Sequence, residues 1–141
     1  FALPTSFTHW RRESFLETAG PNLRQAWSSP PVWDRDNFYI NYVGHPYQGA
    51  YYYNTLRSQG HPIWKSGLFL AAQTFLWEYG FEAIKEHPSR QDLITTPIGG
   101  LLIGELTHRL TIRMKRGGFT FWEKTFVTLF NPAYVLNIGY R

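Results

Sequence analysis

The sequence contains no cysteine and little charge. Charged side chains make up 17% of its 141 residues, against roughly 25% in an average globular protein. The absence of cysteine excludes a disulfide scaffold, a thiolate metal site and a cysteine nucleophile. Low charge together with 18% aromatic residues excludes disorder over the whole length, because disordered chains are poor in aromatic rings and rich in charge. One folded domain is the expectation for this length.

Long apolar runs are lacking as well. The two most apolar stretches, residues 66–77 and 93–104, are much shorter than the roughly 18–20 residues of a transmembrane helix and suit a buried or partly inserted helix. Tyrosine and tryptophan favour membrane–water interfaces as well as packed cores. The aromatic excess therefore fits an interfacial protein and an aromatic-packed soluble core equally well. Because the chain begins without an initiator methionine or a signal peptide, we expect a mature product or an excised domain.

The excess positive charge lies at the C-terminal end of the chain. Residues 1–100 carry as many basic as acidic side chains, so the net charge of +4 comes from residues 101–141. Arg109, Arg113 and Arg116 have the spacing of one helix face. Both a solvated face and a strip beside anionic lipid head groups fit this pattern. No nucleic-acid-binding motif is present, and nucleic acid is not an expected partner.

The spacing of proline, glycine and apolar residues predicts a mostly α-helical fold, a compact bundle of about five helices, some of them short or kinked. Residues 1–33 are expected to form an irregular N-terminal arm with a short helix over 10–18, and residues 34–141 a single helical domain. After a break at residues 44–46, helices are predicted over 47–58, 62–86, 89–96, 97–116 and 120–130. The tail over 133–141 alternates as a strand does, but it is too short to assign.

Acidic and histidine side chains gather around these breaks. His45 lies at a proline break, where backbone carbonyls lose hydrogen bonds and polar groups collect. Glu78 and Glu82 are four residues apart, so their charges repel unless solvent, an arginine, a proton or a metal relieves them. Asp92 follows Ser89 in a pattern typical of a capping box. The candidate catalytic residues are therefore His45, Glu78, Glu82 and Asp92, and a purely structural polar network is the simpler alternative.

A wider set of residues accompanies these four. The candidates for ligand binding or for a polar network are Asn41, Tyr42, Tyr47, Tyr79, Ser89, Gln91, Thr95, Thr96 and Glu105. Glycines at positions 99, 100 and 104 (Gly99, Gly100 and Gly104) form a small-residue face typical of close helix packing. Glu105 is expected to pair with Arg109, four residues on. The sequence predicts no cofactor and no metal site, and it lacks the common nucleotide-binding and hydrolase motifs.

The same blocks resemble a bacterial family of unknown function, DUF3943. The ordered series of matching motifs is Trp33-Asp34-x-Asp36, Asn41-Tyr42-Val43-Gly44-His45-Pro46-Tyr47, Phe75-x-Trp77-Glu78-Tyr79-Gly80-x-Glu82, Pro88-Ser89-x-Gln91-Asp92-Leu93, Thr96-Pro97-x-Gly99-Gly100, Gly104-Glu105 and Asn131-Pro132. The resemblance implies a bacterial cell-envelope protein, often part of a longer exported chain, and implies no reaction. A looser similarity to VanZ-like membrane proteins rests on Glu82, Pro88, Arg90, Asp92, Gly100 and Gly104.

Two functions follow, and the sequence leaves open whether the protein is an enzyme. The first is a non-enzymatic helical module of the bacterial cell envelope, periplasm-facing and membrane-associated, whose partner is membrane lipid or another envelope protein. The second is a hydrolase or transferase acting on a lipid or a lipid-linked precursor. It would use one carboxylate as a base, or a histidine and two carboxylates to hold a metal. The second function requires His45, Glu78 and Asp92 to share one polar cluster.

Overall fold

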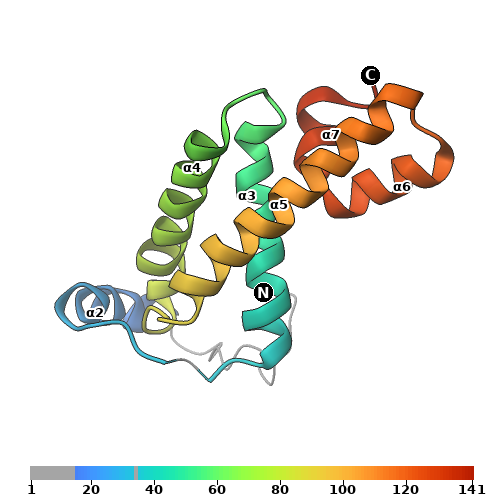
Figure 1. The fold of residues 1–141 in the computed structure, drawn as a ribbon. Coiled ribbons are helices and arrows are strands. Elements are labelled where there is room, and N and C mark those ends of the chain that lie inside the picture. The colour runs from blue at the N-terminus through green and yellow to red at the C-terminus, as the bar shows by residue number, and fades with distance from the viewer. Residues whose placement is uncertain (1–14, 34) are drawn as a thin grey trace.

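The structure, a computed structural model, describes residues 15–33 and 35–141 (Figure 1). Over these ranges it consists of helices without a β-strand, which confirms the predicted mostly α-helical class. The α-helices are α2 (Phe15–Ser28), α3 (His45–Arg57), α4 (Ile63–Leu76), α5 (Asp92–Gly117), α6 (Phe121–Phe130) and α7 (Pro132–Ile138). A π-helical turn, Ile40–Gly44, leads into α3. A second π-helical turn, Trp77–Phe81, and a 3-10 turn, Glu82–Ile84, follow α4.

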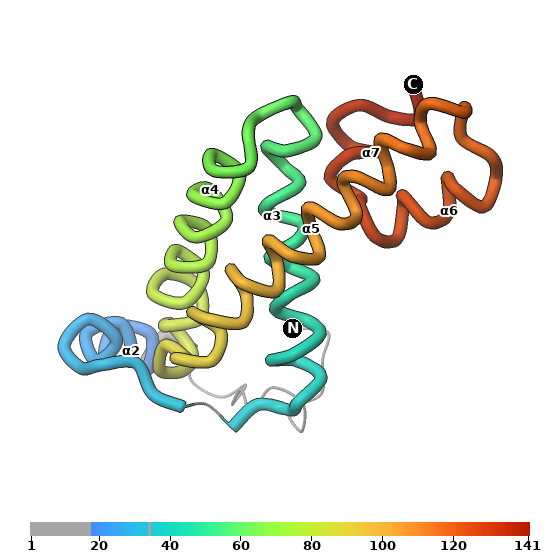
Figure 2. Tube along the Cα trace, in the orientation of Figure 1, coloured from blue at the N-terminus to red at the C-terminus, as the bar shows by residue number. Residues whose placement is uncertain are grey.

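Helices α3, α4 and α5 form the centre of the bundle. α3 and α4 run in opposite directions and are joined by a tight turn, and α5 crosses in front of α3 (Figures 1 and 2). α3 packs against both of its neighbours. α2 lies against the turns that follow α4, whereas α6 and α7 lie toward the C-terminal end of α5 (Figure 1). The start of α5 contacts the π-turn before α3, and α6 packs against α5 as well.

The contact between α3 and α5 is made of small residues. A Cβ atom on Gly100 would lie 2.5 Å from the carbonyl carbon of Gly49 and 2.6 Å from its Cα. Gly99 lies against Pro46, and Gly104 lies against the ring of Tyr53. The glycine face of α5 is thus the surface that packs on α3, and it lets the two main chains approach closely.

The interior of the bundle is polar. Among the described residues, sixteen polar or charged residues are buried and only eight apolar ones. The buried face of α4 is formed by Ser66, Leu70 and Thr74, and Glu78 follows in the π-turn. Twenty-six large apolar side chains of the described chain are exposed instead. A helix bundle in water places its apolar stripes inside, so this fold reverses the usual arrangement.

The helices predicted over 47–58, 62–86 and 120–130 are confirmed in outline, with changes at their ends. The expected break at 44–46 is a π-turn that runs directly into α3. Pro46 is the second residue of that helix, at the point where the π-turn gives way to α-helical geometry. The helix predicted to reach residue 86 leaves α-helical geometry after Leu76.

Part of the expected irregular arm is helical, which corrects the prediction. α2 occupies most of residues 15–33, whereas the short helix was predicted over 10–18; residues 1–14 lie outside the described ranges. The side-chain amide of Asn22 donates to the carbonyl oxygen of Ile84 at 3.0 Å. Such tertiary contacts, rather than local propensity, supply most of the stability of a short helix. This segment therefore packs on the bundle.

The predicted separate helices over 89–96 and 97–116 are one helix, α5. Pro97 lies inside it, in the second turn. A Cβ on Gly49 of α3 would meet Thr96 and Gly100, so α3 contacts α5 on both sides of the proline. This packing outweighs the local cost of Pro97, because tertiary context overrides helix propensity.

The C-terminal tail, whose strand-like alternation was too short to assign, forms helix α7. The side chain of Asn131 accepts a hydrogen bond from the N–H of Tyr134 at 3.2 Å and so caps the helix. Pro132 is the first helical residue, a position that proline favours because its N–H would have no partner there.

Candidate functional site

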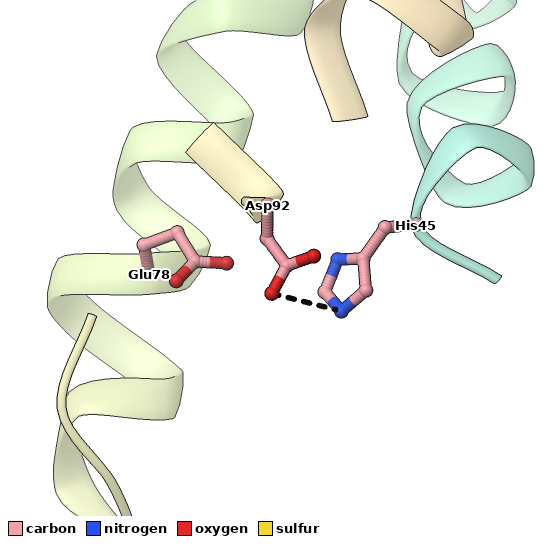
Figure 3. Close-up of side chains that lie close together, drawn as sticks. All are labelled: His45, Glu78 and Asp92. Carbon is pink, nitrogen blue, oxygen red and sulfur yellow. Dashed lines mark ion pairs between the residues drawn. The ribbon is translucent and has the colours of Figure 1, made fainter. Parts of the chain in front are cut away.

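His45, Glu78 and Asp92 meet at one end of the bundle. They come from the start of α3, the π-turn after α4 and the start of α5, and Asp92 lies between the other two (Figure 3). Each offers a ligand atom, and these atoms all lie within 4.8 Å of one another. The Nε2 atom of His45 is 3.8 Å from Oδ2 of Asp92. The requirement that the three residues share one polar cluster is therefore met.

The cluster is buried. The exposed fractions of His45, Glu78 and Asp92 are 6%, 1% and 4%. An imidazole and two carboxylates can bind a divalent ion or move protons. Since so little of each side chain reaches solvent, a substrate could touch them only after the surrounding helices moved.

Irregular backbone geometry positions two of the three side chains. His45 directly follows the π-turn Ile40–Gly44, and Glu78 lies within the π-turn Trp77–Phe81. A π-turn widens the helix locally and rotates the residues that follow it, and such turns are frequent at functional sites. The two π-turns therefore place His45 and Glu78 at the same end of the bundle.

Ser89 links the two carboxylate-bearing segments. Its N–H donates to Oε2 of Glu78 at 2.9 Å, and its hydroxyl oxygen accepts from the N–H of Asp92 at 3.1 Å. Ser89 also forms an isolated parallel bridge with Val32, in the segment that follows α2. The loop before α5 is thus held from both sides, and a main-chain donor fixes the orientation of Glu78.

Glu82 adds a third carboxyl group. It is buried, and its carboxyl group lies close to that of Glu78. Burial, followed by the charges of Glu78, Glu86 and Asp92, raises the pKa of Glu82 to about 10. These effects favour the protonated, neutral form of Glu82. A proton thus relieves the repulsion that the four-residue spacing predicted.

Several of the wider candidates lie on the same elements as the cluster. Asn41 is buried in the π-turn before His45, and Thr96 is buried about one turn after Asp92. The side-chain amide of Gln91 donates to the hydroxyl of Tyr42 at 3.3 Å. The half-buried Thr95 precedes Pro97 in α5.

Other candidates lie away from the cluster. The hydroxyl of Tyr47 donates to the carbonyl oxygen of Leu129 at 2.7 Å and so ties α3 to α6. Tyr79 packs its ring against Trp27 of α2, with the ring centroids 5.2 Å apart. These two tyrosines connect helices, and neither contact involves the three clustered residues.

Glu105 forms a second polar centre, farther along α5. Its carboxylate accepts hydrogen bonds from Arg57 at 2.9 Å, from Arg109 at 2.8 Å and from the Tyr53 hydroxyl at 2.6 Å. Burial raises the pKa of Glu105, but these hydrogen bonds outweigh burial and hold it at about 2. The predicted pair with Arg109 is confirmed. Arg57 and Tyr53 escaped prediction, because only the packing of α3 on α5 brings them near.

A pocket of about 480 Å³ adjoins this second centre. Its lining consists of Arg57, Ile63, Glu105, His108, Arg109, Ile112, Arg113 and Arg116. The three arginines predicted to share a helix face thus line one pocket, together with Arg57 and Glu105. Burial, followed by the charge of Arg57, lowers the pKa of His108, so this histidine adds no charge at neutral pH.

A protein-family model matches most of the chain. The family described as Domain of unknown function (DUF3943) covers residues 30–133. No curated protein and no solved structure matches the chain significantly. The matched range includes the whole His45, Glu78 and Asp92 cluster.

Proposed function

The protein belongs to the DUF3943 family, and we propose that it is a non-enzymatic helical module lying at a membrane surface of the bacterial cell envelope. The proposal rests on the polar interior of the bundle and its exposed apolar side chains. In membrane proteins, small residues let helices approach, polar groups face the bundle interior and apolar side chains face lipid. In the described residues, glycines line the contact between α3 and α5, polar side chains are buried and large apolar side chains are exposed, which supports the proposal. The bacterial envelope itself, and the periplasm-facing side, rest on the family resemblance.

Helix α5 carries an exposed apolar stripe. Ile94, Ile98, Leu102 and Leu106 follow one another at four-residue intervals and are between 55% and 64% exposed. The stripe is about 18 Å long at 1.5 Å per residue, shorter than the roughly 30 Å of a bilayer's hydrocarbon core. No helix in the described ranges combines the length and apolar character that crossing a membrane requires. The stripe therefore suits contact with a membrane surface.

Basic residues continue this stripe toward the end of α5. Arg109, Arg113 and Arg116 follow Leu106 at helical spacing. An anionic membrane presents phosphate groups immediately outside its hydrocarbon layer, and arginine side chains are attracted to them. The order of apolar and basic residues along α5 favours an anionic lipid surface over an apolar protein partner.

Helix α4 carries a second apolar stripe. Trp64 and Leu68 are each 65% exposed, and Phe75 and Leu76 continue the stripe toward the end of the helix. Tryptophan favours the membrane–water interface because its indole ring is apolar and its N–H is polar. α4 therefore offers the same kind of surface as α5.

Vesicle flotation tests the proposal. The full chain should float with vesicles that contain phosphatidylglycerol and bind weakly to vesicles of phosphatidylcholine alone. Leu102→Glu should weaken binding at least about ten-fold, because burying a leucine side chain contributes roughly 1.5–3 kcal/mol. Leu136→Glu is the matched control, since Leu136 is also well exposed but lies on α7. A freely soluble monomer that does not bind anionic vesicles would refute the proposal.

One observation favours a second candidate, a hydrolase or transferase that acts on a lipid or a lipid-linked precursor. His45, Glu78 and Asp92 converge, as the chemistry of such an enzyme requires. Their burial weighs against it, because a substrate would have to open the bundle. Incubating the protein with an envelope lipid extract, and following the products by mass spectrometry, tests this candidate. Turnover that disappears in Asp92→Asn would favour it, and unchanged lipids would exclude it for that extract.

A further inference from the structure

We propose that His45, Glu78 and Asp92 form a closed binding site for one divalent transition-metal ion. This site is independent of the membrane role and departs from the sequence's prediction of no metal. Imidazole nitrogen and carboxylate oxygen are common ligands of Zn²⁺, Fe²⁺ and Mn²⁺. Mg²⁺ and Ca²⁺ prefer oxygen ligands alone, so the histidine favours a transition metal.

The distances suit such an ion after a small contraction. Two ligands that each lie about 2.1 Å from a tetrahedral ion are about 3.4 Å apart. The Nε2 atom of His45 and Oδ2 of Asp92 are 3.8 Å apart, and all three ligand atoms lie within 4.8 Å of one another. Side-chain movements of less than about 1 Å bring the three atoms to bonding distance, and such movements need no change of the helices.

Hydrogen bonds already orient one ligand. The main-chain N–H of Ser89 donates to Oε2 of Glu78, and the buried carboxyl group of Glu82 lies close to that of Glu78. In metal sites the ligating carboxylates are usually held by further hydrogen bonds of this kind, which orient them and tune the metal. Ser89 and Glu82 are the residues in that role here.

Burial indicates a structural ion. Three protein ligands leave one position of a tetrahedral ion, which a second carboxylate oxygen of Glu78 or Asp92 can fill, and a site closed in this way holds a structural ion. A divalent ion between the two carboxylates would attract both of them strongly in the low-dielectric interior. The three ligands come from segments that are far apart in the chain, so the ion would hold together the adjoining ends of α3, α4 and α5.

Titration of the wild-type protein tests the site directly. The full chain, freed of metal with EDTA and kept in detergent, is titrated with ZnCl₂, MnCl₂ and CoCl₂ by calorimetry, and with MgCl₂ for comparison. We expect one transition-metal ion per chain, much weaker binding of Mg²⁺ and a higher melting temperature with the ion bound. The cobalt complex should show visible absorption bands of a site with nitrogen and oxygen ligands. Absence of saturable binding at one ion per chain overturns the proposal.

Variants locate the ion. His45→Gln and Asp92→Asn should each weaken binding by more than about 100-fold, and Glu82→Gln by about 10- to 100-fold, the range for residues that support a ligand. His108→Gln is the matched control, because His108 is 7% exposed and lies on α5 among the arginines. Equal losses in His45→Gln and His108→Gln overturn the assignment. If the ligand variants do not fold, the cobalt spectrum of the wild type decides, and a spectrum without nitrogen ligation overturns the site.

Discussion

Replacing Gly100 with alanine should destabilise the protein, although alanine is the better helix former. Gly100 lies within α5, at the contact with α3. A Cβ atom there would lie 2.5 Å from the carbonyl carbon of Gly49 and 3.0 Å from the nitrogen of Ala50. These neighbours are main-chain atoms that cannot rotate away, so α3 and α5 would have to separate.

The expected loss is about 2 kcal/mol. Carbon atoms in favourable contact are about 3.5–4.0 Å apart, so the helices would have to move by roughly 1 Å. Overpacking costs typically about 1–3 kcal/mol, and the rigid neighbours place Gly100 at the upper end of that range. The higher helix propensity of alanine returns at most about 1 kcal/mol. For a chain of this size, the melting temperature should fall by roughly 4–8 °C.

Gly67→Ala provides the matched control. Gly67 lies inside α4, and a Cβ atom there would meet only Cδ1 of Leu101 at 3.5 Å, an ordinary contact distance. This variant should gain up to about 1 kcal/mol from helix propensity. Thermal unfolding followed by circular dichroism compares both variants with the wild type. If Gly100→Ala melts at or above the wild-type temperature, the close main-chain contact between α3 and α5 is refuted.

Two further predictions concern the second polar centre and the start of α6. Glu105→Gln should lower the free energy of unfolding by about 1–2 kcal/mol at neutral pH. This loss lies between those for an exposed and for a broken buried ion pair, because the side chain of Glu105 is 14% exposed and that of Arg109 is 71% exposed. The pKa of Glu105, about 2, lies below the ordinary 4.5, so its stabilisation is complete above about pH 4.5 and is lost as the pH falls toward 2. Urea unfolding at about pH 7 and about pH 3 should show the gap between wild type and variant narrowing in acid; a constant gap would contradict this assignment. Thr120→Ala removes a capping box with Glu123 and should cost about 1 kcal/mol in thermal unfolding, whereas Thr125→Ala, at a half-buried position inside α6, should cost less.

Helices with local signals were predictable, and those shaped by packing were not. α6 begins at a capping box, and Gly118, with φ of +78°, follows the end of α5. Pro97 is a strong local signal to end a helix, yet contact with α3 carries α5 through it. The start of α7 had its own signal, since asparagine followed by proline is typical of a helix start, but the alternation after it left the tail unassigned.

Some residues of the candidate site also had local sequence signals, whereas others are brought together only by helix packing. His45 and Glu78 stand beside breaks in helix geometry, and Asp92 begins a helix, so proline and acidic spacing were enough to select them. The partners of Glu105 had no such signal apart from Arg109. Arg57 is 48 residues away in the sequence and reaches Glu105 only because α3 and α5 pack together. Whether the selected residues act in binding or catalysis stays a prediction, as does the similarity to VanZ-like proteins.

The direction in which each helix faces follows from the polar cluster, not from hydrophobic periodicity. On α4, the apolar series that includes Trp64 and Leu68 and the polar series that leads to Glu78 both have helical spacing, so periodicity alone cannot tell inside from outside. For a protein in water, the expectation that apolar residues are buried would place the side of α4 that carries Trp64 and Leu68 in the interior. On α5, however, only the glycine face can approach α3, and the same face carries Asp92 toward His45. Once Asp92 and Glu78 face each other, the apolar stripes must point outward. The burial of the cluster and the exposure of the apolar stripes therefore both depend on how α4 and α5 are rotated about their own axes. A substitution that rotated either helix would remove both features.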